Sequence, residues 1–301
     1  MNIPVTDQMG AMLAVFGALA VAFESILVRK YTVKGSIREL IGIVILVNAV
    51  VWSGISIFYY YPDFDLSTKS ILAFIFSGIF GFFLGYILFF TSIKRIGASK
   101  TMPIIRTQVI VALFLSIMFL GETLTPFHLL GICIMIFGTI LVSREISGDD
   151  DTSAKKSRWT GLLIPLAGGV SWGLNWFFTR LGLLTGTPVA VGLAISSIAA
   201  LLGFTLLETI EKRKVPFMKL VSPNPLWFIF IGMICALAFL FNFLALSISR
   251  VVVVNPIWQI SPLFVLILSY LFLPKLEKIT LKLVIGSLLI VCGTVIVFIF
   301  M

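Results

Sequence analysis

Ten apolar runs, separated by polar or glycine- and proline-rich breaks, occupy most of this chain of 301 residues. Each run is close to the roughly 20 residues that an α-helix needs to cross about 30 Å of hydrocarbon. The approximate limits of the runs are 9–28, 37–59, 70–92, 99–120, 125–143, 159–179, 187–208, 225–247, 252–273 and 280–300. We therefore expect an all-α integral membrane protein with ten transmembrane helices.

Composition supports this class and argues against others. Hydrophobic residues make up 59% of the chain and charged residues 12%, whereas soluble domains carry about 25% charged residues. In a soluble protein the formal net charge of +9 would suggest a nucleic-acid partner. Here we interpret it as loop charge that sets topology, with membrane lipid as the surroundings and no nucleic acid as partner.

The three cysteines, Cys133, Cys235 and Cys292, lie inside apolar runs and show no Cys-x-x-Cys spacing. We interpret them as small buried apolar residues. A disulfide framework or a metal site is not expected from this pattern.

The second half of the chain repeats the first at an offset of 151 residues, which grows to 153 and then to 155. The aligned positions include glycine, proline, charged and amide residues in one order: Gly17 and Gly168, Glu24 and Asn175, Arg29 and Arg180, Pro103 and Pro256, Gly131 and Gly286, Gly138 and Gly293. Shared positions of these types in one order are harder to obtain by chance than apolar matches. We infer a duplication.

The duplication predicts a first five-helix repeat at 1–147, a hydrophilic linker at 148–158 and a second repeat at 159–301. Five spans is an odd number, so the second repeat must enter the membrane from the opposite side. Inverted repeats of this kind are common in secondary transporters, with the substrate site near the midplane. Because both repeats are in one chain, we expect a monomer.

Lysine and arginine are concentrated in the loops after the first, third, fifth, seventh and ninth runs. The other face carries only Lys69, Arg180 and Arg250. By the positive-inside rule the richer face, with the 144–158 segment, is cytoplasmic, and both termini lie outside the plasma membrane.

With these features the chain resembles the drug/metabolite transporter superfamily, specifically its ten-span EamA-type members. The resemblance covers nearly the whole chain and rests on the duplication, the Ser-Trp-Gly-Leu-Asn segment 171–175, the Met-Phe-Leu-Gly-Glu segment 118–122 and the paired glycines of the fifth and tenth runs. It implies an inverted-repeat transporter of small organic solutes, often an exporter of amino acids or related metabolites. It also implies a cavity built from spans 1, 3, 4, 6, 8 and 9.

Two features depart from the family pattern. Relatives usually carry a basic loop after the second span and keep the N-terminus inside, but here the segment 59–65 is acidic. In addition, Glu24 and Arg106 stand where many relatives have neutral residues.

Two charges are expected inside the membrane at matching depth. Glu24 lies five residues before Arg29, and Arg106 lies six residues after Lys100. At about 1.5 Å per residue both lie roughly 8–9 Å inside the same face, where they are placed to pair. We interpret Arg106 as the ligand of a carboxylate or phosphate, and Glu24 as its resting partner or a proton-coupling acid; the alternative is a structural ion pair.

Symmetry predicts an amide pair, Asn175 and Gln259, near the opposite mouth, since these residues are the repeat counterparts of Glu24 and Arg106. Pro103 and Pro256 are expected in the first turn of their helices, where they mark gate points. The predicted substrate site consists of charged, amide and aromatic side chains: Arg106, Glu24, Asn175, Gln259, Trp258, Trp176, Tyr86, Phe83, Phe90 and Asn242. Packing alone is the alternative explanation for the aromatic stripe at 83, 86 and 90.

No Gly-x-Ser-x-Gly elbow, phosphate-binding loop or metal-ligand cluster occurs in the sequence. We therefore expect no enzyme, cofactor or metal, and no ATP-driven pump. The sequence predicts a secondary transporter, an exporter or exchanger, that moves small polar or amphipathic metabolites such as amino acids or organic anions by alternating access. The alternatives are a proton-coupled exporter of cationic drugs and a non-transporting membrane scaffold or receptor.

Overall fold

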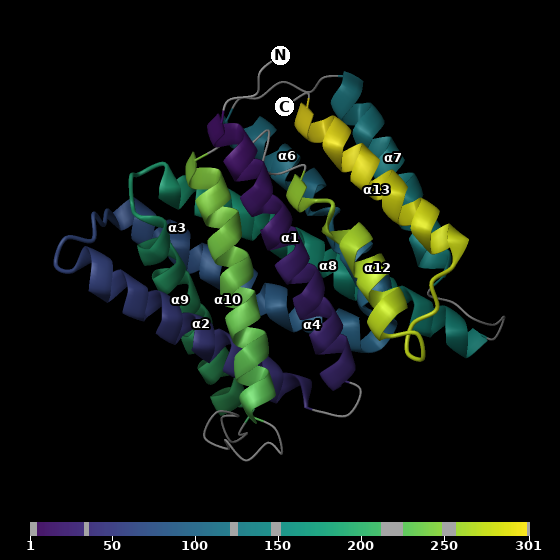
Figure 1. Cartoon of the computed structure of the whole chain (residues 1–301), viewed down its shortest axis with the longest axis horizontal. Coiled ribbons are helices and arrows are strands. Elements are labelled where there is room, and N and C mark those ends of the chain that lie inside the picture. Colours follow the sequence, from purple (N-terminus) through teal and green to yellow (C-terminus); the bar gives the residue numbers. More distant parts are fainter. Residues whose placement is uncertain are drawn as a thin grey trace.

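The computed structural model describes residues 5–32, 36–120, 126–145, 152–211, 225–248 and 257–299, and its regular elements are all helices (Figure 1). In order they are α1 (Val5–Thr32), α2 (Ile37–Tyr60), α3 (Thr68–Gly78), the π-helix η1 (Ile79–Gly85), α4 (Tyr86–Ile96), α5 (Ala98–Ile105), α6 (Gln108–Leu120), α7 (Pro126–Arg144), α8 (Thr152–Leu183), α9 (Val189–Ile210), α10 (Pro225–Ile248), α12 (Ser261–Phe272) and α13 (Leu281–Ile299). The expectation of an all-α chain is confirmed for these residues.

Six helical segments are long and apolar enough to cross a membrane: Gln8–Thr32, Ile37–Tyr60, Thr68–Ile96, Pro126–Arg144, Gly161–Leu183 and Val189–Ile210. Three shorter apolar helices follow at Leu226–Asn242, Ser261–Phe272 and Leu281–Val297. Large apolar side chains such as Phe114, Phe119 and Phe137 are exposed on the outside. In water this surface would be unfavourable, whereas lipid tails accept it, so the chain is an integral membrane protein.

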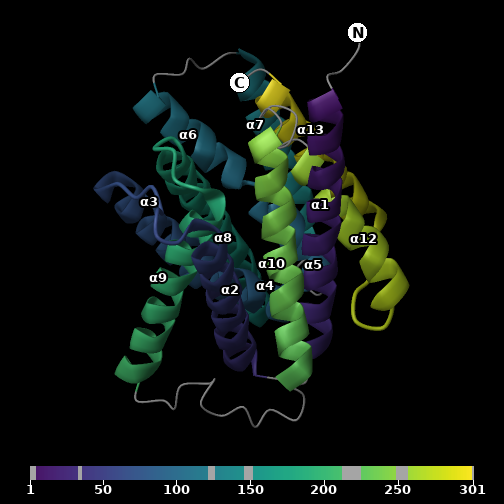
Figure 2. The same ribbon diagram turned by 60° about the vertical axis from the view of Figure 1, so that its left-hand side comes forward.

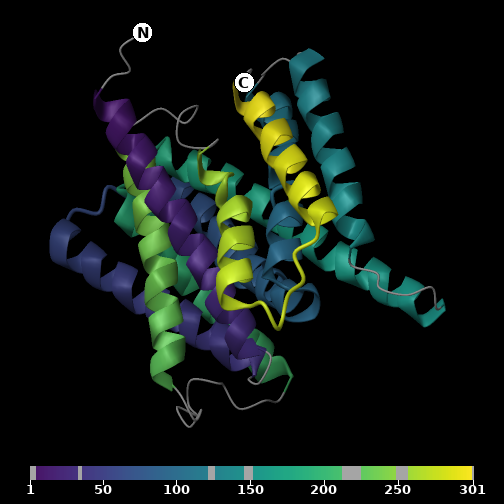
Figure 3. The ribbon, with the colours of Figure 1, turned by 45° about the vertical axis from the view of Figure 1, so that its right-hand side comes forward.

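Helices α7 and α13 pack antiparallel along their glycines (Figures 1 and 3). A Cβ atom added to Gly131 would lie 2.7 Å from the carbonyl oxygen of Gly293, and one added to Gly138 would lie 2.7 Å from that of Gly286. Small residues let helix backbones approach this closely within a membrane. The last helices of the two halves are thus joined by the glycines that the repeat aligns.

The remaining helices pack in equivalent ways in the two halves. Helix α1 packs against α10 and α12 (Figure 2), while its repeat counterpart α8 packs against the α3–η1–α4 segment and against α5 and α6. Helices α2 and α9, which are also counterparts, pack against each other. This arrangement places α12 beside α1 and the α5–α6 segment beside α8.

Two helices are interrupted at equivalent points. Between α5 and α6 the Thr107 N–H donates to the Ile104 carbonyl at 3.1 Å, and before α12 the Ile260 N–H donates to the Ile257 carbonyl at 3.1 Å. These tight turns are 153 residues apart, the same offset that aligns Pro103 with Pro256. Discontinuous helices at matching places in two repeats are typical of transporter binding sites.

Pro103 does not lie in a first turn as expected. Helix α5 begins at Ala98, so Pro103 lies inside it, three residues before the break at Arg106. Because proline has no N–H, it leaves one carbonyl of the preceding turn without its usual donor and favours the interruption. Pro256 lies outside the described residues.

Helix α8 begins at Thr152, inside the segment expected to be a linker. Residues 152–160 contain no glycine or proline, and Ala154, Lys155 and Lys156 are good helix formers, so nothing in this stretch stops the helix from extending.

Candidate functional site

A cavity of about 50 Å³ lies where the two interrupted helices meet α1, α4, α8 and α10. Its walls combine two charged residues, one amide and a group of aromatic and apolar side chains: Val21, Glu24, Tyr86, Phe89, Met102, Ile105, Arg106, Gln108, Trp172, Trp176, Phe239 and Trp258. Both intramembrane charges that the sequence singles out therefore line one cavity.

Glu24 lies on α1 and is only 3% exposed. Its Oε1 atom has no hydrogen-bond partner among the described residues. The Cys235 thiol of α10 interacts with the Glu24 side chain and also shares a hydrogen bond with the Tyr86 hydroxyl. A buried carboxyl oxygen without a partner costs free energy, which a ligand donor or a proton in the cavity would recover.

Arg106 lies at the α5–α6 break and is 4% exposed. Its Nη2 atom donates a hydrogen bond to the hydroxyl of Ser261, the first residue of α12, while its Nε atom has no partner in the described part of the chain. Arg106 thus joins the two interrupted helices and keeps donor capacity free in the cavity wall.

Glu24 and Arg106 do not pair directly. Among the described residues the ion pairs join Arg29 with Glu277 and Arg38 with Glu208 and Glu211. The two charges share the cavity, but each keeps one polar atom that has no hydrogen-bond partner among the described residues.

Asn175 and Gln259 have separate surroundings. The Asn175 Nδ2 atom donates to the Ser77 carbonyl and hydroxyl, both at 2.9 Å, above the space left by Gly81 of η1. Gln259 is buried at the second helix break, and its Oε1 atom has no partner among the residues that the structure describes. No hydrogen bond joins these two amides in the described part of the chain, and neither lines the cavity with Arg106.

The π-helix η1 changes the face that the third span presents. A π-helical turn holds more residues than an α-helical turn, so a side-chain stripe counted with α-helical spacing shifts around the axis. Tyr86 lines the cavity together with Phe89, whereas Phe83 lies against Gly203 of α9 and Phe90 stacks on Tyr86 with ring centroids 5.3 Å apart.

Three further residues, two tryptophans and one asparagine, complete the predicted site. Trp176 and Trp258 line the cavity, and the Trp258 ring lies against Gly17 of α1. Asn242 of α10 is fully buried but does not line the cavity, and both polar atoms of its amide lack partners among the described residues.

A model of the EamA-like transporter family matches the chain twice, at residues 8–144 and 159–299. The chain belongs to the EamA-like transporter family. The resemblance inferred from the sequence is confirmed, and so are the two repeats. Membership in the EamA-like family supports transport across a membrane as the general activity, and the family is generally non-enzymatic.

A solved structure described as "Crystal structure of protein" has a similar fold, with a TM-score of 0.63 and 17% sequence identity over 97% of this chain and 95% of that chain. This likeness concerns the fold alone. No curated protein matches this EamA-like chain.

The sequence prediction for this EamA-like protein omits several residues that line the cavity or contact its lining residues. Ser261 is the repeat counterpart of Gln108, and both follow their helix break by two residues, so the 153-residue offset could have identified it. Trp172 lies in the family motif at 171–175, and its Nε1 atom has no partner within the described ranges. No sequence signal identifies Phe239 as a cavity residue, and none predicts that the Cys235 thiol contacts Glu24 and Tyr86.

The prediction that all three cysteines are buried is wrong for two of them. Cys235 is buried, but Cys133 of α7 and Cys292 of α13 are exposed. Apolar helix faces in contact with lipid look the same in sequence as faces in contact with protein, which explains the error.

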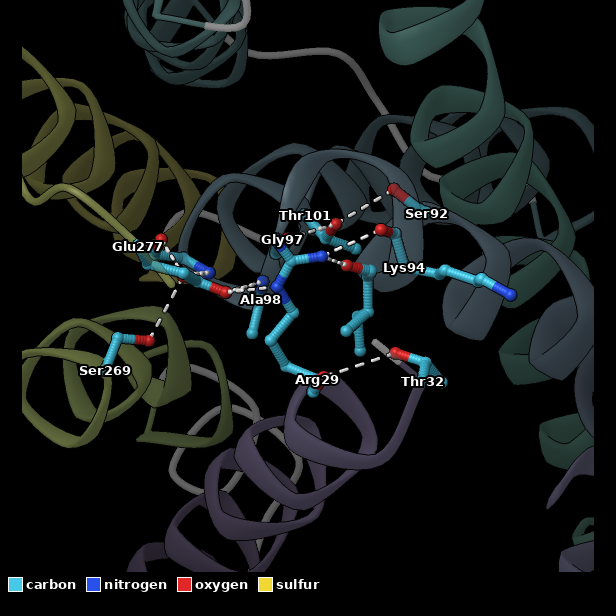
Figure 4. A network of polar contacts seen from close by, with 11 residues as sticks. Arg29, Thr32, Ser92, Lys94, Gly97, Ala98, Thr101, Ser269 and Glu277 are labelled. Carbon is cyan, nitrogen blue, oxygen red and sulfur yellow. Dashed lines mark hydrogen bonds and ion pairs between the residues drawn. The ribbon is translucent and has the colours of Figure 1, made fainter. Parts of the chain in front are cut away.

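A second polar cluster lies at the end of α1 that carries Arg29 (Figure 4). The Arg29 Nε atom lies 3.4 Å from Glu277 Oε1, and its Nη1 atom donates to the carbonyls of Ile93 and Lys94 at 3.0 and 2.7 Å. Glu277 also accepts from the Ala98 N–H at 2.6 Å and the Ser99 N–H at 2.9 Å. One buried carboxylate therefore links α1, the start of α5 and the α12–α13 loop.

Proposed function

We propose that the chain is a ten-span secondary transporter of small zwitterionic or anionic metabolites, such as amino acids or related organic anions. The ten-span count adds the α5–α6 pair and the shorter apolar helices to the six long spans. The two repeats would have opposite orientations, in keeping with the antiparallel α7–α13 pair.

The observation that carries this proposal is the set of unsatisfied polar atoms around one cavity. Glu24 Oε1 is an acceptor, while Arg106 Nε and Trp172 Nε1 are donors, and the side chains of all three residues line the cavity. Buried polar groups are nearly always satisfied in folded proteins, so this clustering favours a ligand that supplies the missing partners. A solute with an ammonium and a carboxylate group offers both kinds of partner.

Arg106 would bind the substrate carboxylate, since a guanidinium offers parallel donors to a planar anion. Glu24 would bind an ammonium group or exchange a proton during the cycle. Its unpartnered oxygen and its contact with the Cys235 thiol support a carboxyl that changes protonation state without losing a salt bridge. The aromatic walls would receive apolar parts of the solute.

Alternating access requires two mouths that open in turn. The Arg29–Glu277 cluster closes the mouth on the lysine- and arginine-rich face, which we assign to the cytoplasm. Opening this mouth would separate α1 and α5 from the α12–α13 loop. Asn175 and the gate prolines remain proposed parts of the path, with Gln259 at the second break.

A cationic-drug exporter is a second candidate, favoured by one specific contact. Arg106 is bonded to Ser261 and forms no ion pair with Glu24, so its positive charge does not neutralise the carboxyl. Aromatic rings around a carboxyl are also suited to a quaternary ammonium ion.

The test is counterflow in proteoliposomes with the purified full-length protein and a panel of amino acids, organic anions and quaternary amines. Exchange of amino acids or organic anions supports the main proposal, whereas exchange confined to quaternary amines supports the second candidate. A membrane scaffold predicts no exchange of any solute, and that result would overturn both.

A further inference from the structure

A second and larger cavity lies beside the Arg29–Glu277 cluster and has a volume of about 710 Å³. Its walls come from the end of α1, the α4–α5 turn, α8 near Gly161 and the α12–α13 loop. It is separate from the cavity that contains Arg106, because the two share no lining residue.

The walls of this cavity are strongly basic. Among the described residues, five cationic side chains line it, namely Arg29, Arg95, Lys100, Lys275 and Lys278, and Glu277 is the one acidic residue there. The Glu277 carboxylate is already engaged, since it lies 3.4 Å from Arg29 Nε and accepts from the backbone N–H groups of Ala98 and Ser99 (Figure 4). Four positive charges therefore lack an acidic partner among the described lining residues.

Lysines and arginines in cytoplasmic loops are usually explained by the positive-inside rule alone. That rule requires charged residues in cytoplasmic loops, but it does not require their side chains to line one cavity. Here cationic side chains from four segments line one cavity. Lys100 is half-buried, and its Nζ atom donates a hydrogen bond to the Glu145 carbonyl oxygen at 2.5 Å. By contrast Lys30 and Lys94 are exposed on the same side and line no part of it, and the Lys94 side chain extends away from the cluster (Figure 4).

The cavity also joins the two repeats. Arg95 and Lys100 belong to the first repeat, while Lys275 and Lys278 belong to the second. An anion with several oxygen atoms would satisfy cations from both repeats at once, and it would hold together the same segments that the Arg29–Glu277 pair joins.

We propose that this cavity is a binding site for a phosphate-bearing anion at the mouth of the transporter. Phosphate oxygens accept from several guanidinium and ammonium groups together. Basic pockets between helices at the cytoplasmic membrane surface are suited to anionic headgroups. The phosphate group is either that of an anionic lipid or that of a soluble ion, and bound anion stabilises the closed mouth.

The experiment measures binding to the purified full-length protein in neutral detergent by native mass spectrometry and thermal unfolding. The probes are phosphatidylglycerol and cardiolipin, phosphatidylcholine as the zwitterionic comparison, and inorganic phosphate and pyrophosphate. The variant is Lys275→Gln/Lys278→Gln. Its control is Lys30→Gln/Lys94→Gln, which removes the same charge from the same face outside the cavity.

We expect anionic probes to bind wild type and the control equally and to bind the cavity variant about 25-fold more weakly, about fivefold for each lysine. Binding of the anionic lipids alone identifies a headgroup as the source, whereas binding of phosphate or pyrophosphate identifies a soluble ion. Equal loss of binding in both variants, equal binding of phosphatidylcholine, or no binding of any anionic probe would overturn the proposal. Because the readout is binding, the result is independent of whether the protein transports a given solute.

Discussion

The guanidinium of Arg106 donates a hydrogen bond to the hydroxyl of Ser261, and this contact joins the interrupted helices of the two repeats. Arg106 occupies the break after α5, while Ser261 begins α12 directly after the second break. The repeat aligns Arg106 with Gln259 and Gln108 with Ser261. The halves therefore meet through residues that are close to equivalent in position but differ in charge.

This difference places one positive charge in the cavity wall. In the first repeat the break carries a cation that lines the cavity, and in the second repeat it carries a neutral amide whose Oε1 atom has no partner among the described residues. Amides at both breaks would leave this part of the wall without a positive charge. The substitution of arginine for an amide at one break favours anionic groups, in agreement with the proposed substrate class.

The glycine contact between α7 and α13 yields a stability prediction. Gly138→Ala would place a Cβ atom 2.7 Å from the Gly286 carbonyl oxygen, and the two helices would have to separate. Overpacking of this kind costs about 1–3 kcal/mol. We expect a lower melting temperature in detergent. Gly54→Ala is the matched control, since no atom of the described residues lies within 4 Å of its added Cβ, and an equal or larger decrease there would contradict the packing explanation.

The Arg29–Glu277 pair yields a prediction about the mouth. Glu277→Gln removes the charge opposite Arg29 and keeps only one acceptor oxygen, so one of the two backbone N–H groups of Ala98 and Ser99 loses its partner. The ion pair and the lost hydrogen bond each contribute about 1 kcal/mol, so we expect at least about fivefold more of the open state.

The reporter for this prediction is the reaction of the native Cys235 thiol with a small polar thiol reagent, in a Cys133→Ala/Cys292→Ala background. Labelling of Cys235 should accelerate in Glu277→Gln. Glu211→Gln, which weakens the α2–α9 ion pair with Arg38, serves as the control and should label at the original rate. Identical acceleration in both variants would indicate general loosening rather than opening of the mouth.

Glu24→Gln tests proton coupling. A carboxyl that gains and loses a proton in each cycle makes the rate of exchange depend on pH, and a neutral amide of the same shape cannot do so. We expect the variant to lose the pH dependence of flux. Glu208→Gln provides the comparison, because Glu208 is a buried carboxylate paired with Arg38 outside the cavity. Unchanged flux and pH dependence in Glu24→Gln would remove Glu24 from the mechanism.

Topology is tested at the two ends of α8. In a background without the native cysteines, Thr152→Cys at the start of the helix should be protected from an impermeant reagent in intact cells. Thr185→Cys, in the turn that follows the helix, should be labelled. The reverse pattern would place the termini inside and overturn the orientation deduced from lysine and arginine.

The helices could be predicted from the sequence because a run of about 20 apolar residues has few alternatives in a membrane. The repeat could be predicted as well, because glycines and charges recur at fixed offsets, and the two family matches confirm it. The helix breaks were only marked by Pro103 and Pro256. Helix α5, which precedes the first break, begins at Ala98, where Glu277 accepts from the backbone N–H, and that contact comes from a distant part of the chain.

Details of the candidate site depend on tertiary contacts that periodicity does not encode. Gly81 and Gly85 lie in a π-helix, and the close approach of Asn175 and Trp172 to these glycines accompanies the changed register. The aromatic stripe therefore includes Phe89 in the cavity wall and leaves Phe83 against α9. The pairing of Glu24 with Arg106 was also inferred from depth alone, which fixes height in the membrane but not the direction of a side chain.

The most direct test of the central claim is counterflow by Arg106→Ala, measured solute by solute beside wild type. Loss of a buried charge that binds its ligand costs about 2–5 kcal/mol, so exchange of carboxylate-bearing solutes should fall by a factor of about 30 or more, while any exchange of quaternary amines should persist. Arg180→Ala, which changes an exposed arginine outside the cavity, should exchange every solute like wild type. If Arg106→Ala exchanges carboxylate-bearing solutes as fast as wild type, Arg106 is not the substrate ligand and the proposed site is wrong.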